Sequence, residues 1–395
     1  MTSVTAPGSA PVRLKIDLGA LADNWRELAR RSAPGRCAAV VKANAYGAGV
    51  SKAAPALWAA GARIFFVAHF SEGLAARQAL PPQALIYVLN GLEGEADPID
   101  YVQHRLAPVI GGAEELQRWS AFAAQRGRPS RSALHLDTGM NRLGFESLPR
   151  LQAAMEAHGP MSGADLLISH FVSSEIPDDP INQAQIERFE AARAAFPRLA
   201  ASLANSSGMF LDQRPIYDLA RPGYALYGGN PRPGRANPPG RANPMHAVVT
   251  LTAAIQQIRW IEPGMTCGYN AQWTAKRPTR LATLLIGYAD GLPRAAGATD
   301  ARPGAEVAVA GRRCPLVGRV SMDLAIVDIT DLPEDAVQAG GRAEFFGPTI
   351  DLDDFAARSG TIGYHLLTSL GPRCHLEYVG RPSAQPVGAM DTDAA

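Results

Sequence analysis

A lysine at the end of a buried apolar run is the residue of this sequence best suited to do chemistry. Lys42 follows the apolar part of AAVVKANAYGAG, which is typical of a buried strand followed by a turn. The only other lysines are Lys15, Lys52 and Lys276. A lysine partly withdrawn from water loses its proton more readily, and the neutral amine can form a Schiff base with an aldehyde. A solvated surface position is the ordinary alternative for a lysine, but the preceding apolar run favours covalent chemistry here.

The elements that must position this lysine are short apolar runs that alternate with amphipathic helical stretches. The runs CAAVV, IFFVAH, ALIYVLN, LAPVI and ADLLISHF are typical of parallel strands buried on both faces. We expect an α/β fold in which residues 12–243 form a (β/α)8 TIM-like barrel with catalytic groups at the carboxyl ends of its strands. A doubly wound sheet is less favoured because no GxGxxG follows the first strand.

A change of composition indicates a second domain. Residues 230–244 read NPRPGRANPPGRANP, which repeats GRANP and is too rich in Pro and Gly for regular structure. Beyond it, runs such as AVVTLTAAIQQIRWI and DLAIVDI indicate strands, and one helical stretch is expected over 352–371. We therefore expect a smaller, mostly β domain over 244–385 and a disordered tail over 386–395.

Composition excludes several classes of function. The 38 Lys plus Arg nearly balance the 37 Asp plus Glu, and no run of like charge suggests nucleic acid or a membrane surface. The four cysteines are scattered, without the spacing of metal ligands, and we expect reduced thiols, no metal and a cytoplasmic location. No export signal or membrane span is expected.

Several short blocks, in order along the chain, resemble the alanine racemase family. VVKANAYGAG is similar to the lysine motif by which that family binds pyridoxal 5'-phosphate. The blocks KIDLGALADN, HLDTGMNRLG, SHF, NSSG, RPGYALYG, GYADG, RVSMD and TIGY agree with it, so the resemblance spans residues 13–380. It implies a barrel followed by a β domain, working as a homodimer on alanine.

The resemblance also implies which residues hold the cofactor. Lys42 carries it, and Arg221 faces its pyridine nitrogen; because arginine keeps its proton, that nitrogen stays unprotonated and the ring is a weaker electron sink. Ser206 can donate a hydroxyl, and Gly223 and Tyr224 can donate backbone N–H groups, to the phosphate. The remaining cofactor-binding residues implied are Tyr46, Arg142, His170, Asn205 and Tyr364.

Racemisation needs a proton removed from one face of the α-carbon and returned to the other. The resemblance gives these roles to Lys42 and Tyr269, with His170 between Tyr269 and Arg221. It also implies that Tyr269 comes from the partner subunit. Residues near the substrate are then Arg142, Tyr288, Met322 and Asp323.

One position departs from the family pattern. His135 stands where many members have a carbamylated lysine that braces Arg142. Histidine does not carry that carbamate in the same way, so we expect an anion or the imidazole itself to hold Arg142.

Other functions remain as alternatives. A serine or broad-specificity racemase would share the site, but the export signal and disulfides associated with it are missing. A decarboxylase of the same fold type would need a catalytic Cys motif and a glycine-rich phosphate loop that we do not find. A pyridoxal-phosphate carrier would lack the β domain and Tyr269. The sequence leaves open whether D-alanine is made for peptidoglycan or broken down.

Overall fold

The computed structural model describes residues 10–94, 96–234 and 243–380. These fall into two compact units. One unit holds residues 21–226 and the described part of 230–246; the other holds the described residues up to Ala20, residues 227–229 and residues 247–380. The expected tail over 386–395 and most of the repeated GRANP segment lie outside the described residues.

The first unit is a parallel barrel, which confirms the predicted fold class. Seven strands pair in parallel in the order β3-β4-β5-β6-β7-β8-β9. Their bounds are Ala39–Val40, Ile64–Val67, Leu85–Val88, Leu106–Ile110, Ser132–His135, Ala164–Ile168 and Ala200–Ser202. Most of their residues are buried, and every residue of β4 and β6 is, because helices cover the outer face while side chains fill the interior.

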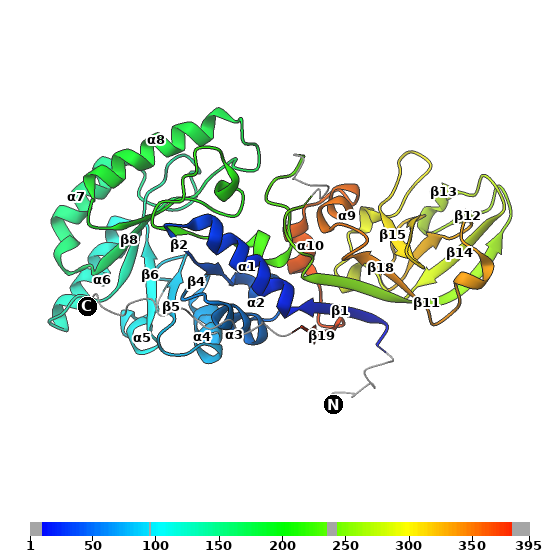
Figure 1. Ribbon diagram of the computed structural model, residues 1–395, viewed down its shortest axis with the longest axis horizontal. Coiled ribbons are helices and arrows are strands. Elements are labelled where there is room, and N and C mark those ends of the chain that lie inside the picture. The colour runs from blue at the N-terminus through cyan, green and yellow to red at the C-terminus, as the bar shows by residue number, and fades with distance from the viewer. Residues whose placement is uncertain (1–9, 95, 235–242, 381–395) are drawn as a thin grey trace. The chain divides into compact units, whose positions relative to one another are not determined.

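A short strand closes the ring. β10 (Leu219–Ala220) pairs in parallel with β2 (Arg36–Cys37), which immediately precedes β3. On its other side, Asp218 N–H donates to Ala201 O in β9 at 3.1 Å. Figure 1 shows the helices that follow these strands lying outside the ring. The helices of this part of the chain are α1 (Leu18–Ser32), α2 (Lys42–Tyr46), α3 (Val50–Ala60), α4 (Phe70–Ala79), α5 (Pro98–Gln103), α6 (Ala113–Gln125), α7 (Leu148–His158) and α8 (Pro180–Ala195).

The second unit is built on a sheet to which the start of the chain contributes. β1 (Val12–Asp17) has alternate residues buried, and it pairs antiparallel with β11 (Val249–Ile261) and parallel with β19 (His375–Val379). We expected residues 12–243 to belong to the barrel, whereas β1 is a strand of this eight-stranded sheet. The other strands are β14 (Thr279–Leu284), β15 (Glu306–Val309), β16 (Arg312–Pro315), β17 (Ala325–Asp328) and β18 (Arg342–Phe346), beside the separate pair β12 (Thr266–Cys267) and β13 (Trp273–Thr274).

The single helical stretch expected over 352–371 forms two helices instead. α9 (Leu352–Arg358) ends before Gly360, whose φ of +70° is left-handed, and α10 (Gly363–Ser369) follows. Glycine adopts this conformation at little cost, so the chain turns here. None of the helices among the described residues has the length and apolar composition needed to cross a membrane.

Candidate active site

Lys42 lies at the carboxyl end of a barrel strand and opens a strained turn. It follows β3, and Ala43, Asn44, Ala45 and Tyr46 all have φ between 51° and 57°. Left-handed backbone costs about 1–2 kcal/mol for each residue with a side chain. Such strain is kept where surrounding contacts enforce it, and it is concentrated at functional sites. The turn therefore marks the segment around Lys42 as built for a task other than stability.

A carboxylate that the sequence analysis missed holds this turn. Glu72, in the first turn of α4, accepts a hydrogen bond from Ala43 N–H at 2.6 Å through Oε1. Its Oε2 accepts from the backbone N–H groups of Ala68 at 2.8 Å and His69 at 3.3 Å. Burial and the charge of Arg142 lower the pKa of Lys42, and the Glu72 carboxylate partly opposes them. A Glu at the third position of a helix that follows a buried strand is the signal that could have identified it.

We expect Glu72→Gln to weaken catalysis through Lys42. The amide can accept from only one side, and the loss of negative charge lowers the pKa of Lys42 further. Hydrogen bonds to charged groups contribute about 1.5–3 kcal/mol, so kcat/KM should fall about tenfold or more. The rate profile should also shift toward lower pH.

Glu115→Gln is the matched control, because Glu115 also binds backbone N–H groups, of Leu92 and Gly111, after a neighbouring strand. It should leave the pH profile unchanged. A Glu72→Gln enzyme with the native rate and profile would show that Glu72 does not position Lys42.

Arg221 is buried in the barrel beside His170. Its guanidinium donates to Ser202 O at 2.7 Å, to Ser202 Oγ at 2.6 Å and to Ser169 O. Burial lowers the pKa of Arg221 to about 9, which still leaves the group charged at neutral pH. Burial, followed by the charge of Arg221, holds the pKa of His170 well below its usual value, so that imidazole is neutral.

A serine hydroxyl, a phenol and a glycine converge after β9 and β10. Ser206 Oγ accepts from Gly223 N–H and Ala225 N–H, both at 3.1 Å. A hydroxyl that accepts two N–H groups still has its own proton to donate. A Cβ on Gly223 would lie 2.3 Å from the Tyr46 hydroxyl, so only glycine fits at position 223. The hydroxyl groups of Ser206 and Tyr46 therefore meet beside the backbone of Gly223 and form a cradle suited to an anion.

Tyr224 and Asn205 are the chain neighbours of Gly223 and Ser206 in this cradle. Tyr224 is buried. Asn205 Oδ1 accepts from Gly208 N–H at 2.8 Å and from the Ser174 hydroxyl at 2.9 Å. The carboxamide oxygen of Asn205 therefore shapes the turn that carries Ser206.

The loop that carries Arg142 is organised by one carboxylate. Asp137 accepts from the N–H groups of Gly139 and Met140 through Oδ1 and from that of Asn141 through Oδ2, at 2.7–2.8 Å. Arg142 lowers the pKa of Lys42 and His170, and its guanidinium has no hydrogen-bond or carboxylate partner among the described residues. Its free donors thus lie near Lys42 and can bind an anion.

His135 ends β7 as a neutral imidazole. Burial, and then the charge of Arg221, lower the pKa of His135 to about 4. A neutral ring can lie beside Arg142 without repulsion.

Because histidine replaces the carbamylated lysine of other family members, removal of bicarbonate should leave the activity unchanged. A His135→Lys variant should instead lose activity when bicarbonate is removed. A buried lysine near two arginines is neutral enough to be carbamylated, and its carbamate would depend on bicarbonate. Rates measured in bicarbonate-free buffer check this, and bicarbonate dependence of the native protein would contradict it.

The remaining predicted residues lie in the β unit. The side chain of Tyr269 is 63% exposed, and those of Met322 and Tyr288 are 53% and 41% exposed. Tyr288 N–H donates to Ser321 O at 3.0 Å, and Arg373 pairs with Asp290 at 2.9 Å and Asp323 at 2.7 Å. These contacts bring Tyr288, Met322 and Asp323 together.

Tyr269 and Tyr364 lie in two other segments of the β unit. Gly268, the residue before Tyr269, lies so close to the backbone of Gly318 and Arg319 that a Cβ would be 2.9 Å from Arg319 N. Tyr364 is half-buried in the first turn of α10. The segment of Tyr269 is therefore packed beside the one that leads to Met322.

Together these features define a class of protein. A half-buried lysine, arginines and hydroxyl donors gathered at the carboxyl ends of a parallel barrel are the arrangement of a (β/α)8 enzyme that binds an anionic ligand. The described residues contain no group of His, Cys, Asp or Glu that could hold a metal ion. The site's chemistry is that of a lysine and its cationic surroundings.

Comparisons with known proteins identify the family within that class. Residues 16–231 match the model of the alanine racemase N-terminal domain, and residues 248–378 match that of the C-terminal domain. An alanine racemase of Methylobacterium sp. (strain 4-46) is 51% identical over 95% of this chain and 100% of its own length. The chain therefore belongs to the alanine racemase family.

Solved structures agree with this assignment. The alanine racemase of Bartonella henselae, described with covalently bound pyridoxal phosphate, has a TM-score of 0.85 and 36% identity, covering 94% of this chain and 100% of its own. The biosynthetic alanine racemase of Pseudomonas aeruginosa has a TM-score of 0.84 and 36% identity, covering 93% and 99%.

Proposed function

We propose that this protein is an alanine racemase that interconverts L-alanine and D-alanine with pyridoxal 5'-phosphate. The observation that carries the proposal is the placement of Lys42 at the mouth of the barrel, with its pKa lowered by burial and by Arg142. Membership of the alanine racemase family over both domains supports the same reaction. When bound, the cofactor supplies an electron-withdrawing ring that makes the α-proton of the amino acid acidic.

The residues of the barrel fit this cofactor. The convergence of Tyr46, Ser206 and Gly223 suits its phosphate, because hydroxyl and amide donors bind such an anion without a metal. Arg221 remains charged and can only donate, so it would keep the ring nitrogen unprotonated. The further residues that we propose around the cofactor are Arg142, His170, Asn205, Tyr224 and Tyr364.

Lys42 and Tyr269 move the protons in this proposal. A lysine whose pKa is lowered gives up its proton more readily, and the neutral amine can take the α-proton from one face. A tyrosine on the opposite face can take or return the other proton when neighbouring donors stabilise its phenolate. Neutral His170 beside Arg221 can serve as such a donor.

We further propose a homodimer in which each active site receives Tyr269 from the partner subunit. Large apolar side chains of the β unit are exposed, which is typical of a surface that contacts another chain. They include Tyr269, Tyr288, Met322, Met265, Leu324 and Ile362. Tyr288, Met322 and Asp323 would then lie near the entrance for substrate, with Arg142 holding the carboxylate.

The biological setting follows from the same reasoning. All four cysteines are free thiols, which supports a cytoplasmic enzyme. D-alanine would be supplied to peptidoglycan or consumed in catabolism. Serine racemisation is the nearest alternative, and decarboxylation by the same fold type is a more distant one.

A racemisation assay tests the proposal. The purified protein, loaded with pyridoxal phosphate, should convert L-alanine to D-alanine and the reverse, measured with enantiomer-specific amino-acid oxidases. L-serine should react more slowly, and no amino acid should release carbon dioxide. Preferred turnover of serine would favour the broader racemase, whereas stoichiometric carbon dioxide would overturn racemisation.

A further inference from the structure

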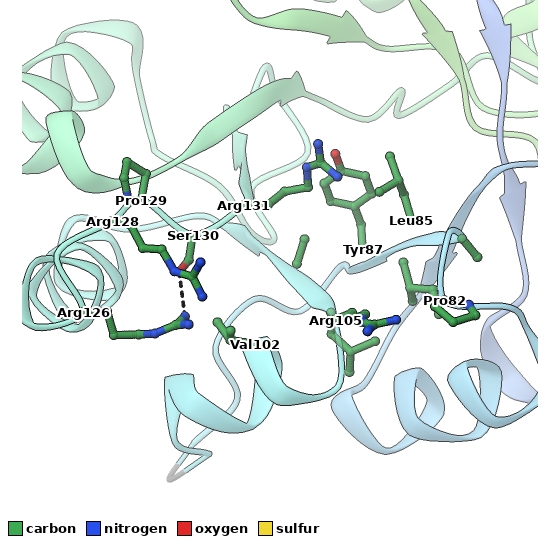
Figure 2. Close-up of a pocket in the computed structure, with 14 residues that line it drawn as sticks. Pro82, Leu85, Tyr87, Val102, Arg105, Arg126, Arg128, Pro129, Ser130 and Arg131 are labelled. Carbon is green, nitrogen blue, oxygen red and sulfur yellow. Dashed lines mark hydrogen bonds between the residues drawn. The ribbon is translucent and has the colours of Figure 1, made fainter. Parts of the chain in front are cut away.

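A pocket of about 380 Å³ opens at the end of the barrel opposite Lys42. Its lining comes from the first residues of β5 and β6 and from the segments that precede β5, β6 and β7, whereas the candidate active site lies after the strands. Figure 2 shows the arginine side chains of these segments around it. We call it the basal pocket, and its charged residues are Arg105, Arg126, Arg128 and Arg131.

The positive charge of the basal pocket is poorly compensated. Arg131 pairs with Asp165 at 2.6 Å, and that carboxylate also accepts from the Tyr87 hydroxyl at 2.7 Å. Arg126 donates only to a neutral acceptor, Ser130 Oγ, at 3.3 Å, besides lying over the ring of Phe122. In the described part of the chain, the guanidinium groups of Arg105 and Arg128 have neither a hydrogen-bond acceptor nor a carboxylate partner.

A further arginine increases the positive charge beside the pocket. Arg77 is fixed by its donations to Pro81 O, Ala84 O and Arg105 O at 2.7–2.9 Å. Burial and the nearby charge of Arg105 lower the pKa of Arg77. The whole chain has a formal net charge of only +1, so this concentration of one sign is local.

The fold does not require arginine at these positions. Arg105 has a φ of 54°, a conformation in which glycine or asparagine is favoured over a long side chain. Four arginines that line one pocket with a single carboxylate partner repel one another, and a bound anion would relieve that repulsion. The arrangement therefore suits a ligand rather than the stability of the barrel.

We propose that the basal pocket binds a phosphorylated small molecule that carries two or more negative charges. Planar guanidinium groups bind phosphate oxygens in pairs, which makes clustered arginines suited to a diphosphate or bisphosphate. Leu85, Val102 and Pro129 give the pocket an apolar wall for the uncharged part of such a molecule. Its volume is within the usual range for small-molecule sites of about 300–1,000 Å³.

Titration calorimetry of the holoenzyme tests this, because bound cofactor blocks the phosphate cradle of the active site. The probes are inorganic pyrophosphate, ATP and fructose 1,6-bisphosphate, which separate the phosphate chemistry from a nucleotide or sugar source. We expect saturable binding of at least one probe, with one site per chain. Affinity should fall as sodium chloride is raised, because the contacts are ionic.

Variants locate the binding. The double variant Arg105→Asn with Arg128→Ser should bind at least tenfold more weakly, and asparagine suits the left-handed backbone at position 105. Arg150→Ser with Arg198→Ser removes the same charge from two exposed positions elsewhere and should bind normally. When none of the three probes is present, both variants of the holoenzyme should racemise alanine at the native rate. That rate would show that they fold. Absence of saturable binding by all three probes, or native affinity in the Arg105 and Arg128 variant, would overturn the proposal.

Discussion

Replacing Lys42 by alanine should lower the rate of racemisation by a factor of about 10²–10⁴ or more. General acid–base groups typically contribute that much, and this lysine would in addition be the attachment point of the cofactor. Borohydride should fix the cofactor to the native protein and to a Lys52→Ala control, whose substituted side chain is exposed on α3. The same treatment should leave Lys42→Ala unlabelled. The visible absorbance of the bound cofactor, recorded before and after reduction, shows the loss of the band.

Peptide mapping makes the assignment unambiguous, because the sequence contains only three other lysines. The labelled peptide should contain VVKANAYGAG. Label on Lys15, Lys52 or Lys276 would show that the cofactor is attached elsewhere and that the strained turn after β3 has another purpose.

Tyr269→Phe should abolish proton exchange on one face of the α-carbon and leave it on the other. Removing the phenol hydroxyl leaves Lys42 able to exchange the proton on only one face, so racemisation should fall about 10²–10⁴-fold. By the resemblance to the family, we expect Lys42 to serve the D enantiomer and Tyr269 the L enantiomer. In deuterated water the variant should therefore exchange the α-proton of D-alanine while producing little L-alanine, as measured by mass spectrometry and chiral chromatography. Full activity of Tyr269→Phe in both directions would contradict the two-base mechanism.

Mixed dimers test whether Tyr269 acts across the subunit interface. Dimers of Lys42→Ala chains or of Tyr269→Phe chains should each racemise very little, whereas a mixed dimer would contain one site with both native groups. Mixing the two proteins should restore part of the activity once subunits exchange. Trp260→Phe serves as the control for an exposed aromatic side chain of the same unit, and it should retain the native rate of racemisation. No recovery despite proven exchange of subunits would place both bases in one chain.

Much of the fold was predictable because its signals are local. Runs such as IFFV and LAPVI are apolar without interruption, and the structure buries every residue of the strands that they form. The position of Lys42 after a strand followed from the same reasoning. The assignment of Val12–Asp17 to the barrel was not correct, because its partners β11 and β19 lie more than 230 residues away along the chain.

Three features could be inferred from the order of residues alone: the alternation of strands and helices, the change to β structure after residue 243, and the residue types needed for chemistry with an aldehyde cofactor. The folded chain was needed to show how Glu72 holds the left-handed turn beside Lys42, how burial makes His135 and His170 neutral, and how four arginines come to line one pocket at the opposite end of the barrel. The physical reason is that hydrophobic periodicity is written along the chain, whereas desolvation and the interaction of charges depend on distances in space. Residues from separate strands acquire those distances only when the barrel closes.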